Sequence, residues 1–239
     1  MNQIYGQLYY IPLYFLAVKG YDPVRTGLST LPIMVTLVPS SMVTGALVTR
    51  TANYRWPIWL GWVLTAVGSF LTVLFDRNTS TMTWATVLII LGLGHGAVLN
   101  AQNFAAQAMC RQGEEGPAAA MYAFMRQSGM ALGVGVGGTV FQNVMSVKLR
   151  WEGLDAGIAR ESEAFVEELQ KMPSESLKKL QVLDAYIYGL RGVYLVYGSI
   201  SGTAFLLSLL LRHFKMAGEV MSAHQFEHQA SAQSHDPDH

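Results

Sequence analysis

The sequence predicts an all-α fold, a polytopic bundle of six transmembrane helices, from its composition and the spacing of its charges. Of the 239 residues, 13% are charged and 51% are apolar, whereas soluble domains usually carry about a quarter charged residues. Several uncharged stretches also reach the ~20 residues that a helix needs to cross a bilayer. These stretches lie between Thr26 and Thr49, Trp56 and Phe75, Asn78 and Cys110, and Gly192 and Leu211.

The predicted spans follow these stretches in chain order. They are Met1–Val18, Leu28–Val48, Trp56–Phe75, Met82–Met109, Gly116–Val147 and Val193–Leu211. The first lacks the basic start and cleavage site of a signal peptide, so we interpret it as a span whose beginning is clipped. Residues 1–145 therefore hold five spans, and residues 146–189 form an extracellular amphipathic loop with two short helices broken at Pro173. Residues 190–212 form the sixth span, and residues 213–239 form a disordered cytoplasmic tail.

A run of glycines marks the fifth span. Gly129, Gly133 and Gly137 recur every four residues in the apolar stretch 124–143. Such glycines cost about 1 kcal/mol each relative to alanine in a water-exposed helix, but in a membrane this spacing lets helices approach closely. At 100° per residue the three share one face, and Arg126 points the same way. The pattern predicts a helix-packing seam, and we expect the other helices to pack around it.

Two polar stripes within the spans are candidates for the wall of a substrate-binding cavity. Gln7, Tyr10 and Tyr14 follow one face of the first span, and lipid cannot satisfy their hydrogen bonds. An interfacial belt of tyrosines is an equally good explanation for this stripe. The second stripe lies in the fourth span and consists of Asn100, Asn103 and Gln107. Hydrogen bonding between helices is the alternative for each of these three residues.

Two ionisable residues fall inside predicted spans and are expected to act in gating or pairing. His95 lies on roughly the opposite face of the fourth span from Asn100, and a neutral histidine bonded to a neighbouring helix is the alternative. Arg126 is placed to pair with an anion or with a carboxylate on another part of the protein. It is also close enough to the span's end to extend toward the interface.

The residues also exclude several function classes. The formal net charge is zero, and no basic patch predicts a nucleic-acid partner. Cys110 is the single cysteine, so no internal disulfide or cysteine metal cluster is expected, and the dispersed histidines of the tail predict no metal site. All 16 acidic residues lie outside the spans, and no catalytic constellation is present, so neither an enzyme nor a cofactor is expected. The sequon at Asn78 is a weak candidate for glycosylation because it lies close to the membrane.

Six spans place both termini on the same side of the membrane. The short connections on one side carry Lys19, Arg25 and Arg77, and those on the other carry Arg50, Arg55, Arg111, Arg212 and Lys215. The positive-inside rule then predicts cytoplasmic termini. Residues 146–189 and Asn78 are expected outside.

Four segments together resemble the fourteen-helix drug:proton antiporter branch of the major facilitator superfamily, most closely its fungal members. They are YYIPLYFLAVKGYDPVRTGLSTLP (9–32), residues 48–56, WLGWVLTAVGSFL (59–71) and MRQSGMALGVGVGGTVFQN (125–143). The resemblance covers most of residues 5–211, with the segments in the family's order. The family's loop motif of Gly, Asp and Arg is only partly matched by Gly45 and Arg50, with no acid between them.

The resemblance implies that the chain is the carboxy-terminal six-helix half of a proton-coupled exporter in the plasma membrane. Its partners would be membrane lipid, a small organic substrate such as a drug, toxin or secondary metabolite, and a missing amino-terminal bundle. The acid-bearing proton site of the family would belong to that missing bundle. A truncated, non-transporting fragment with at most a regulatory role is the alternative.

Overall fold

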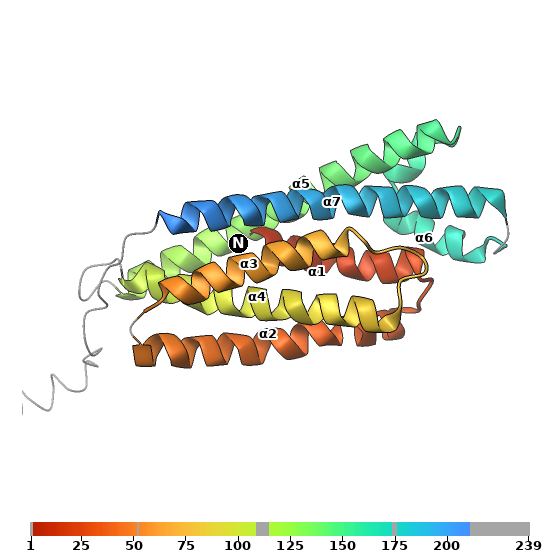
Figure 1. Ribbon diagram of the computed structural model, residues 1–239. Helices are drawn as coiled ribbons and strands as arrows, with labels where there is room; N and C mark the ends of the chain where they lie inside the picture. Colours follow the sequence, from red (N-terminus) through yellow and green to blue (C-terminus); the bar gives the residue numbers. More distant parts are fainter. Residues whose placement is uncertain (1, 52, 109–114, 174–175, 211–239) are drawn as a thin grey trace, which may run out of the picture.

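The computed structural model describes residues 2–51, 53–108, 115–173 and 176–210. The described chain is helical throughout and contains no strand, which confirms the all-α fold class (Figure 1). Its helices are α1 (Asn2–Leu13), the π-helix η1 (Tyr14–Val18), α2 (Pro23–Thr51), α3 (Arg55–Thr72), α4 (Thr81–Ala108), α5 (Glu115–Trp151), the 3₁₀ helix η2 (Ala156–Ala159), α6 (Ser162–Lys171) and α7 (Leu177–Leu209). The predicted tail and Cys110 lie outside the described residues.

Each of the six predicted spans coincides with a helix. Four helices are long and apolar enough to cross a membrane by length and composition: α2, α4, α5 and α7. The helix α3 and the pair α1–η1 are shorter and do not meet that criterion in the described chain. Large apolar side chains such as Leu31, Val35 and Met42 are exposed along α2, as expected where a helix faces lipid or another membrane helix.

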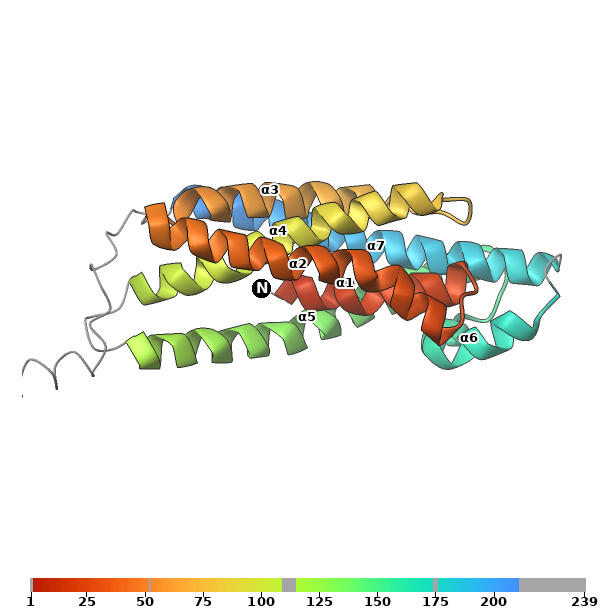
Figure 2. The same ribbon diagram turned by 90° about the horizontal axis from the view of Figure 1, so that it is seen from below.

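The long helices run side by side, and the two ends of the bundle differ (Figures 1 and 2). One end, which we call the cap end, carries the turns after η1 and α3 together with η2 and α6. The other end, the Arg50 end, carries the close of α2 and the start of α3. Helices α1 and η1 lie in the half of the bundle nearer the cap end (Figure 2).

The helix α4, rather than the glycine-rich α5, is the one that packs against two long neighbours through bare backbone. A Cβ at Gly92 would lie 2.6 Å from the carbonyl oxygen of Ile33 in α2, and a Cβ at Gly94 would lie 2.7 Å from the backbone nitrogen of Thr65 in α3. Glycines two residues apart lie on different sides of a helix, so α4 lacks a side chain at its contact with α2 and at its contact with α3. The expectation that all helices gather around α5 was wrong, because α5 packs mainly against α7 and α1.

The loop 146–189 also differs from its prediction. Pro173 does separate two helices, but the second is not a short one, because α7 continues without a break from Leu177 to Leu209. Ser176 caps its start, with Oγ accepting a hydrogen bond from the backbone nitrogen of Lys179 at 3.3 Å. The charged residues after Ser176 therefore belong to the same rigid helix as the apolar span.

Candidate transport site

The three polar residues of the first stripe are all buried, but each points at a different neighbour. Gln7 Nε2 donates to Ser69 Oγ of α3 at 2.5 Å, and Ser69 Oγ donates to the Thr65 carbonyl at 2.7 Å. The Tyr14 hydroxyl donates to the Asp76 carbonyl at 2.8 Å, in the turn after α3. Tyr10 packs on α5, where its ring lies 5.8 Å from that of Phe141. The interfacial-belt alternative does not describe these side chains, which are at most 3% exposed.

The glycine face of α5 is buried and receives tyrosine side chains. The hydroxyl of Tyr197 in α7 donates to the Gly133 carbonyl at 3.0 Å. A Cβ on Gly137 would collide with that same hydroxyl and would lie 2.6 Å from the Tyr10 ring. Gly129 is buried on the same face. The glycines thus open space for aromatic rings from α1 and α7, where the sequence pattern had suggested contact between backbones.

The second polar stripe faces α2. Asn100 Nδ2 donates to the backbone carbonyl of Ser41 at 2.6 Å and to its hydroxyl at 2.8 Å. One turn further along α4, Gln107 Nε2 donates to Asn103 Oδ1 at 3.2 Å. Asn103 and Gln107 are half-buried. The geometry of Asn100 matches the alternative given for it, a hydrogen bond between helices.

The structure does not bring the two stripes together around one cavity. The first stripe, Gln7, Tyr10 and Tyr14, contacts α3, α5 and the turn after α3, whereas Asn100 of the second stripe contacts α2. Among the surface hollows of the described chain, one lies along the apolar face of α7 and another, of about 390 Å³, lies between the end of α5 and η2. Neither is lined by any of the six proposed binding residues.

His95 is buried in the middle of α4, at 2% exposure. Its Nδ1 lies 2.8 Å from the carbonyl oxygen of Leu91, one turn earlier in the same helix. Its other ring nitrogen, Nε2, makes no hydrogen bond within the described chain. The alternative given for this histidine, a hydrogen bond to a neighbouring helix, is not seen among the described residues, since Nδ1 bonds to its own helix and Nε2 has no partner there.

Arg126 is half-buried on α5, one turn after Tyr122. Its Nε is buried and has no hydrogen-bond partner within the described part of the chain. The Tyr122 hydroxyl donates to the Leu99 carbonyl at 2.9 Å, which connects α5 to α4 at this level. The spans α2, α3 and α4 contain no acidic residue that could pair with this guanidinium.

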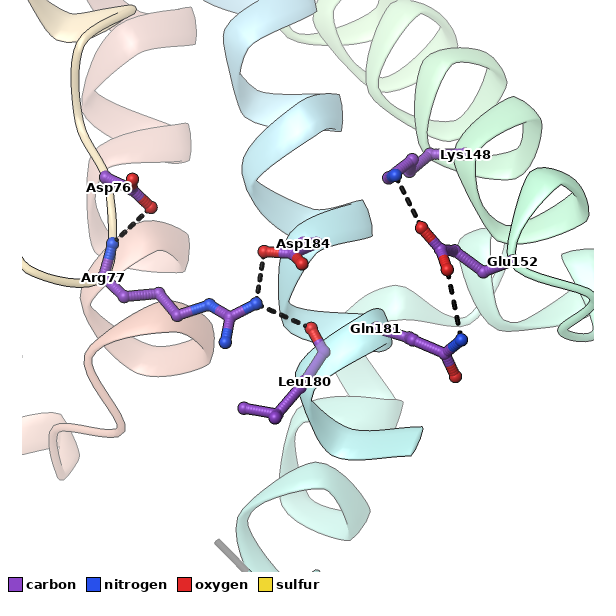
Figure 3. A network of polar contacts seen from close by, with 7 residues as sticks. All are labelled: Asp76, Arg77, Lys148, Glu152, Leu180, Gln181 and Asp184. Atoms are coloured by element: carbon purple, nitrogen blue, oxygen red, sulfur yellow. Dashed lines mark hydrogen bonds and ion pairs between the residues drawn. The ribbon is translucent and has the colours of Figure 1, made fainter. Parts of the chain in front are cut away.

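Several organising contacts at the cap end were not found from the sequence. Arg77 donates to the Asp184 carboxylate and, at 2.8 Å, to the Leu180 carbonyl, which ties the turn after α3 to α7 (Figure 3). Glu152, just past α5, accepts from Lys148 at 2.6 Å and from Gln181 of α7 at 3.1 Å (Figure 3). No sequence pattern links residues so far apart. The even spacing of Gly92, Gly94 and Gly96, by contrast, was available as a sign of two-sided packing.

Asn78, the sequon residue, is exposed in the turn between α3 and α4. The turn is closed by a bond from the Thr79 backbone nitrogen to the Asp76 carbonyl at 3.2 Å. Lys19 Nζ donates to the carbonyls of Arg77 and Thr79 at 2.6 and 2.7 Å. Burial lowers the pKa of Lys19, against the opposing effect of Asp76. Ordered neighbours surround the sequon, and its glycosylation stays a weak prediction.

Long apolar helices packed through glycines, with few charges in their spans, define this protein as a multi-pass membrane protein. Comparison with known proteins then identifies its family. The sequence profile of the Major Facilitator Superfamily matches residues 1–134, which is more than half of the chain. The chain belongs to the major facilitator superfamily, a family of membrane transporters.

The relatives found among curated proteins are fungal transporters. "MFS transporter L2" of Phoma sp. is 34% identical over 228 residues, which cover 94% of this chain and 38% of the relative. "Acurin A biosynthesis cluster MFS-type transporter" of Aspergillus aculeatus is 27% identical, covering 89% of this chain and 40% of the relative. "Efflux pump FUS6" of Gibberella fujikuroi is 26% identical, covering 91% and 40%. The chain thus spans about two-fifths of the length of these relatives.

Proposed function

We propose that this chain is the carboxy-terminal six-helix half of a proton-coupled efflux transporter of the fourteen-helix branch. Its substrates would be small, largely apolar organic molecules: drugs, toxins or secondary metabolites. The observation that carries the proposal is the alignment of almost the whole chain with about two-fifths of longer transporters. Two of those relatives are named for efflux or for a biosynthesis cluster, which supports export of a metabolite.

A second bundle is part of this proposal. Transporters built from repeated bundles hold substrate near the membrane midplane and rock one bundle against the other. Polar side chains on a span must face protein or water. Gln127 and Gln142 are exposed on α5, inside a helix apolar enough to span the membrane. This polar exposure supports a partner bundle packed against α5.

The six polar residues remain proposed substrate contacts within such an assembly. Asn103 and Gln107 are half-buried, so a modest opening between α4 and its neighbours exposes them. Gln7, Tyr10 and Tyr14 are closed off by α3 and α5 in this conformation, which corresponds to an occluded wall. For the membrane, we propose the plasma membrane with both termini in the cytoplasm.

A chimeric transporter tests the proposal. The segment of MFS transporter L2 that matches this chain is replaced by the chain itself, and the fusion is expressed in yeast cells that lack their own efflux pumps. The readout is cellular retention of rhodamine 6G, a lipophilic cationic fluorescent dye, and the control is L2 with that segment deleted. We expect the chimera to lower dye retention and the chain alone to leave it unchanged.

Other outcomes decide between the alternatives. A chimera that reaches the membrane, folds and moves no dye contradicts the transport proposal. A chain that expels dye by itself contradicts the proposal that a second bundle is required. If the chain alone reduces the efflux of intact L2 when the two are expressed together and the chimera is inactive, the regulatory fragment is the better description.

A further inference from the structure

We infer that His95 is a proton-binding group inside this bundle and that the proton is accepted on Nε2. Its role in driving export rests on the function proposed above, but proton binding by the bundle does not. The inference starts from two of the buried side chains that have an unpartnered acceptor atom within the described chain: His95 at Nε2 and Gln7 at Oε1, in residues that are 2% and 1% exposed.

The hydrogen bond of His95 fixes its tautomer. The Leu91 carbonyl can only accept, so Nδ1, at 2.8 Å, carries the proton and donates. In the neutral ring Nε2 is then a bare lone pair. A histidine held this way accepts a proton on Nε2 without giving up its existing hydrogen bond.

The contacts of α4 show where this nitrogen lies. Nearer the cap end, Trp84 packs against Phe15 of η1, with ring centroids 4.9 Å apart. Nearer the Arg50 end, Leu99 bonds to Tyr122 of α5. Residues 84, 88, 91, 95, 99 and 102 share one face at 100° per residue. Leu88 and Leu91 on this face are fully buried, and Leu91 also packs on Gly68 of α3, so His95 faces the interior bounded by α1, α3 and α5.

Among the residues that the structure describes, the helices around the ring offer it no carboxylate. Helices α2 and α3 have no titratable side chain between Thr26 and Thr49 or between Trp56 and Phe75. From α5, the titratable or charged groups on this side are Tyr122 and Arg126. In α1 and η1 the titratable residues are tyrosines: Tyr5, Tyr9, Tyr10 and Tyr14. A charge in an apolar interior is unfavourable unless it is paired or hydrated, so this conformation corresponds to the state after proton release.

Gln7 is placed to accept a hydrogen bond from the protonated ring. Gln7 bonds to Ser69 of α3. The adjacent Gly68 packs on Leu91 of α4, and a Cβ on Gly68 would lie 2.7 Å from the leucine side chain. His95 follows Leu91 by one turn, so Gln7 and His95 lie about one helical turn apart along the bundle. The orientation of the Gln7 amide is fixed too, because Ser69 donates onward to Thr65. Its free oxygen is an acceptor for a new Nε2–H.

The proton step then balances simply. A proton from water on one side forms the Nε2–H bond, and the ring becomes a cation. Water access or the Gln7 oxygen stabilises that cation in a conformation that differs from the one described here. When His95 is buried again, the bond breaks and the proton leaves to water on the other side. Protonation thereby couples to the opening of the bundle interior.

The first experiment measures proton binding directly. His95 is left as the only histidine by replacing five others with glutamine: His213, His224, His228, His235 and His239. The chain is labelled with ¹⁵N-histidine in lipid nanodiscs and followed by NMR from about pH 8 to about pH 3. This extends below the range in which histidine charge usually changes, because a charge at this buried position is unfavourable. We expect the Nδ1–H tautomer at the upper end and reversible protonation of Nε2 on acidification, with the helix content by circular dichroism unchanged.

Two variants check the surroundings. Gln7→Leu removes the acceptor and is expected to weaken proton binding at His95 by about tenfold, since hydrogen bonds to charged groups are among the stronger ones. Gln142→Leu, an exposed glutamine of α5, is the matched control and should leave the titration unchanged. An Nε2–H tautomer at neutral pH, or a ring that stays neutral until the helices unfold, overturns the inference. An unchanged titration in Gln7→Leu overturns the role of Gln7.

The second experiment separates proton binding from transport. The L2 chimera is reconstituted in vesicles, and rhodamine 6G movement is measured with and without a pH gradient. His95→Asn keeps an N–H that can reach the Leu91 carbonyl but takes up no proton. We expect it to lose the acceleration by the gradient while dye exchange without a gradient continues. Gradient-driven movement that survives His95→Asn overturns the coupling role, whereas a chimera that moves no dye while NMR shows proton uptake overturns only the proposed function.

Discussion

At the scale of single residues, Gly137 of α5 determines how three helices meet. Its missing side chain leaves room for the Tyr10 ring from α1 and the Tyr197 hydroxyl from α7. Tyr194 of α7 adds a hydrogen bond to the Tyr10 carbonyl at 3.3 Å. Aromatic side chains bury large apolar areas while their hydroxyls reach polar partners. One glycine therefore permits a contact that fixes α1, α5 and α7 together.

Substitution of Gly137 by leucine should destabilise the bundle. The new side chain overlaps the two tyrosines, and overpacking of this kind typically costs about 1–3 kcal/mol. Gly135→Leu, two residues away on the same helix, is the matched control because a Cβ there meets nothing within 4 Å. Thermal unfolding in nanodiscs should show a lower midpoint for Gly137→Leu only. Equal midpoints for the two variants contradict this account of the glycine face.

The α4 amides should divide into two classes. Asn100→Leu removes two hydrogen bonds to Ser41. Hydrogen bonds between membrane helices contribute about 1 kcal/mol to stability, so we expect this variant to lower the yield of folded protein. Asn103→Leu and Gln107→Leu in the L2 chimera are expected to alter the set of dyes exported while folded yield is kept. The measurements are fluorescence size-exclusion profiles and dye retention. Loss of folded chimera in the latter two variants assigns them to structure.

The sequence predicts which residues are buried and polar better than it predicts what they contact. The helical period places Gln7, Tyr10 and Tyr14 on one face, but three different neighbours meet that face. The contact partner depends on how α3, α5 and α7 cross, and that is set by packing far along the chain. Predicting that Asn100 would turn to Ser41 likewise requires knowing that α2 covers that side of α4.

At the scale of elements, α7 combines a membrane span with a charged extension at the cap end. Its first turns carry Asp184 and Gln181, which bind Arg77 and Glu152 (Figure 3). The sequence assigned these turns to a separate amphipathic helix because their charge differs from that of the span. Charge locates the membrane boundary, but a helix ends only where capping or a breaker ends it, and α7 has neither before Leu209.

The Glu152 contacts predict a pH-dependent contribution to stability. Hydrogen bonding from Lys148, and secondarily from Gln181, lowers the pKa of Glu152 below its usual value. A carboxyl group with a lowered pKa in the folded state stabilises the fold above its usual pKa and loses that effect as the pH falls through the folded value. Glu152→Gln should therefore lower the unfolding midpoint at about pH 7, and the two proteins should converge in acid below the usual glutamate pKa of about 4.3.

The control for this prediction is Glu168→Gln, at an exposed position of α6. It should leave the midpoint unchanged at both pH values. A gap between wild type and Glu152→Gln that persists in acid would mean that the glutamine disturbs packing rather than charge. Because the pair is partly exposed, added salt should also narrow the gap at neutral pH.

At the scale of the whole molecule, the short connections between spans carry more basic residues on one side of the membrane than on the other, from which we predict cytoplasmic termini. The prediction can be checked with single cysteines in a Cys110→Ala background. Asn78→Cys, in the turn at the cap end, should react with a membrane-impermeant maleimide in intact cells. Asn53→Cys, at the Arg50 end, should react only after permeabilisation. The reverse pattern contradicts the predicted orientation, and equal labelling of both sites means that the chain inserts in two orientations.

The helices of the bundle could be predicted from the sequence because membrane-spanning segments are long stretches without charged residues. Uncharged stretches gave α2, α4 and α5 to within a few residues at most ends. The packing order was not accessible, since lipid-facing and protein-facing helices have similar hydropathy. Only the close glycines of α4 distinguish its central position, and their significance depends on knowing that α2 and α3 lie on its two sides.

Because α7 is uninterrupted, movement of its membrane span also moves its extension at the cap end. Its 33 residues extend about 50 Å at 1.5 Å per residue, whereas the hydrocarbon core is about 30 Å thick. When α7 tilts within the membrane, its rigid extension therefore displaces α6 and the turns bound to it. A fluorescent label or an antibody fragment on α6 would report such tilting from the aqueous side. An antibody fragment that joined α6 to a neighbouring surface would stop it.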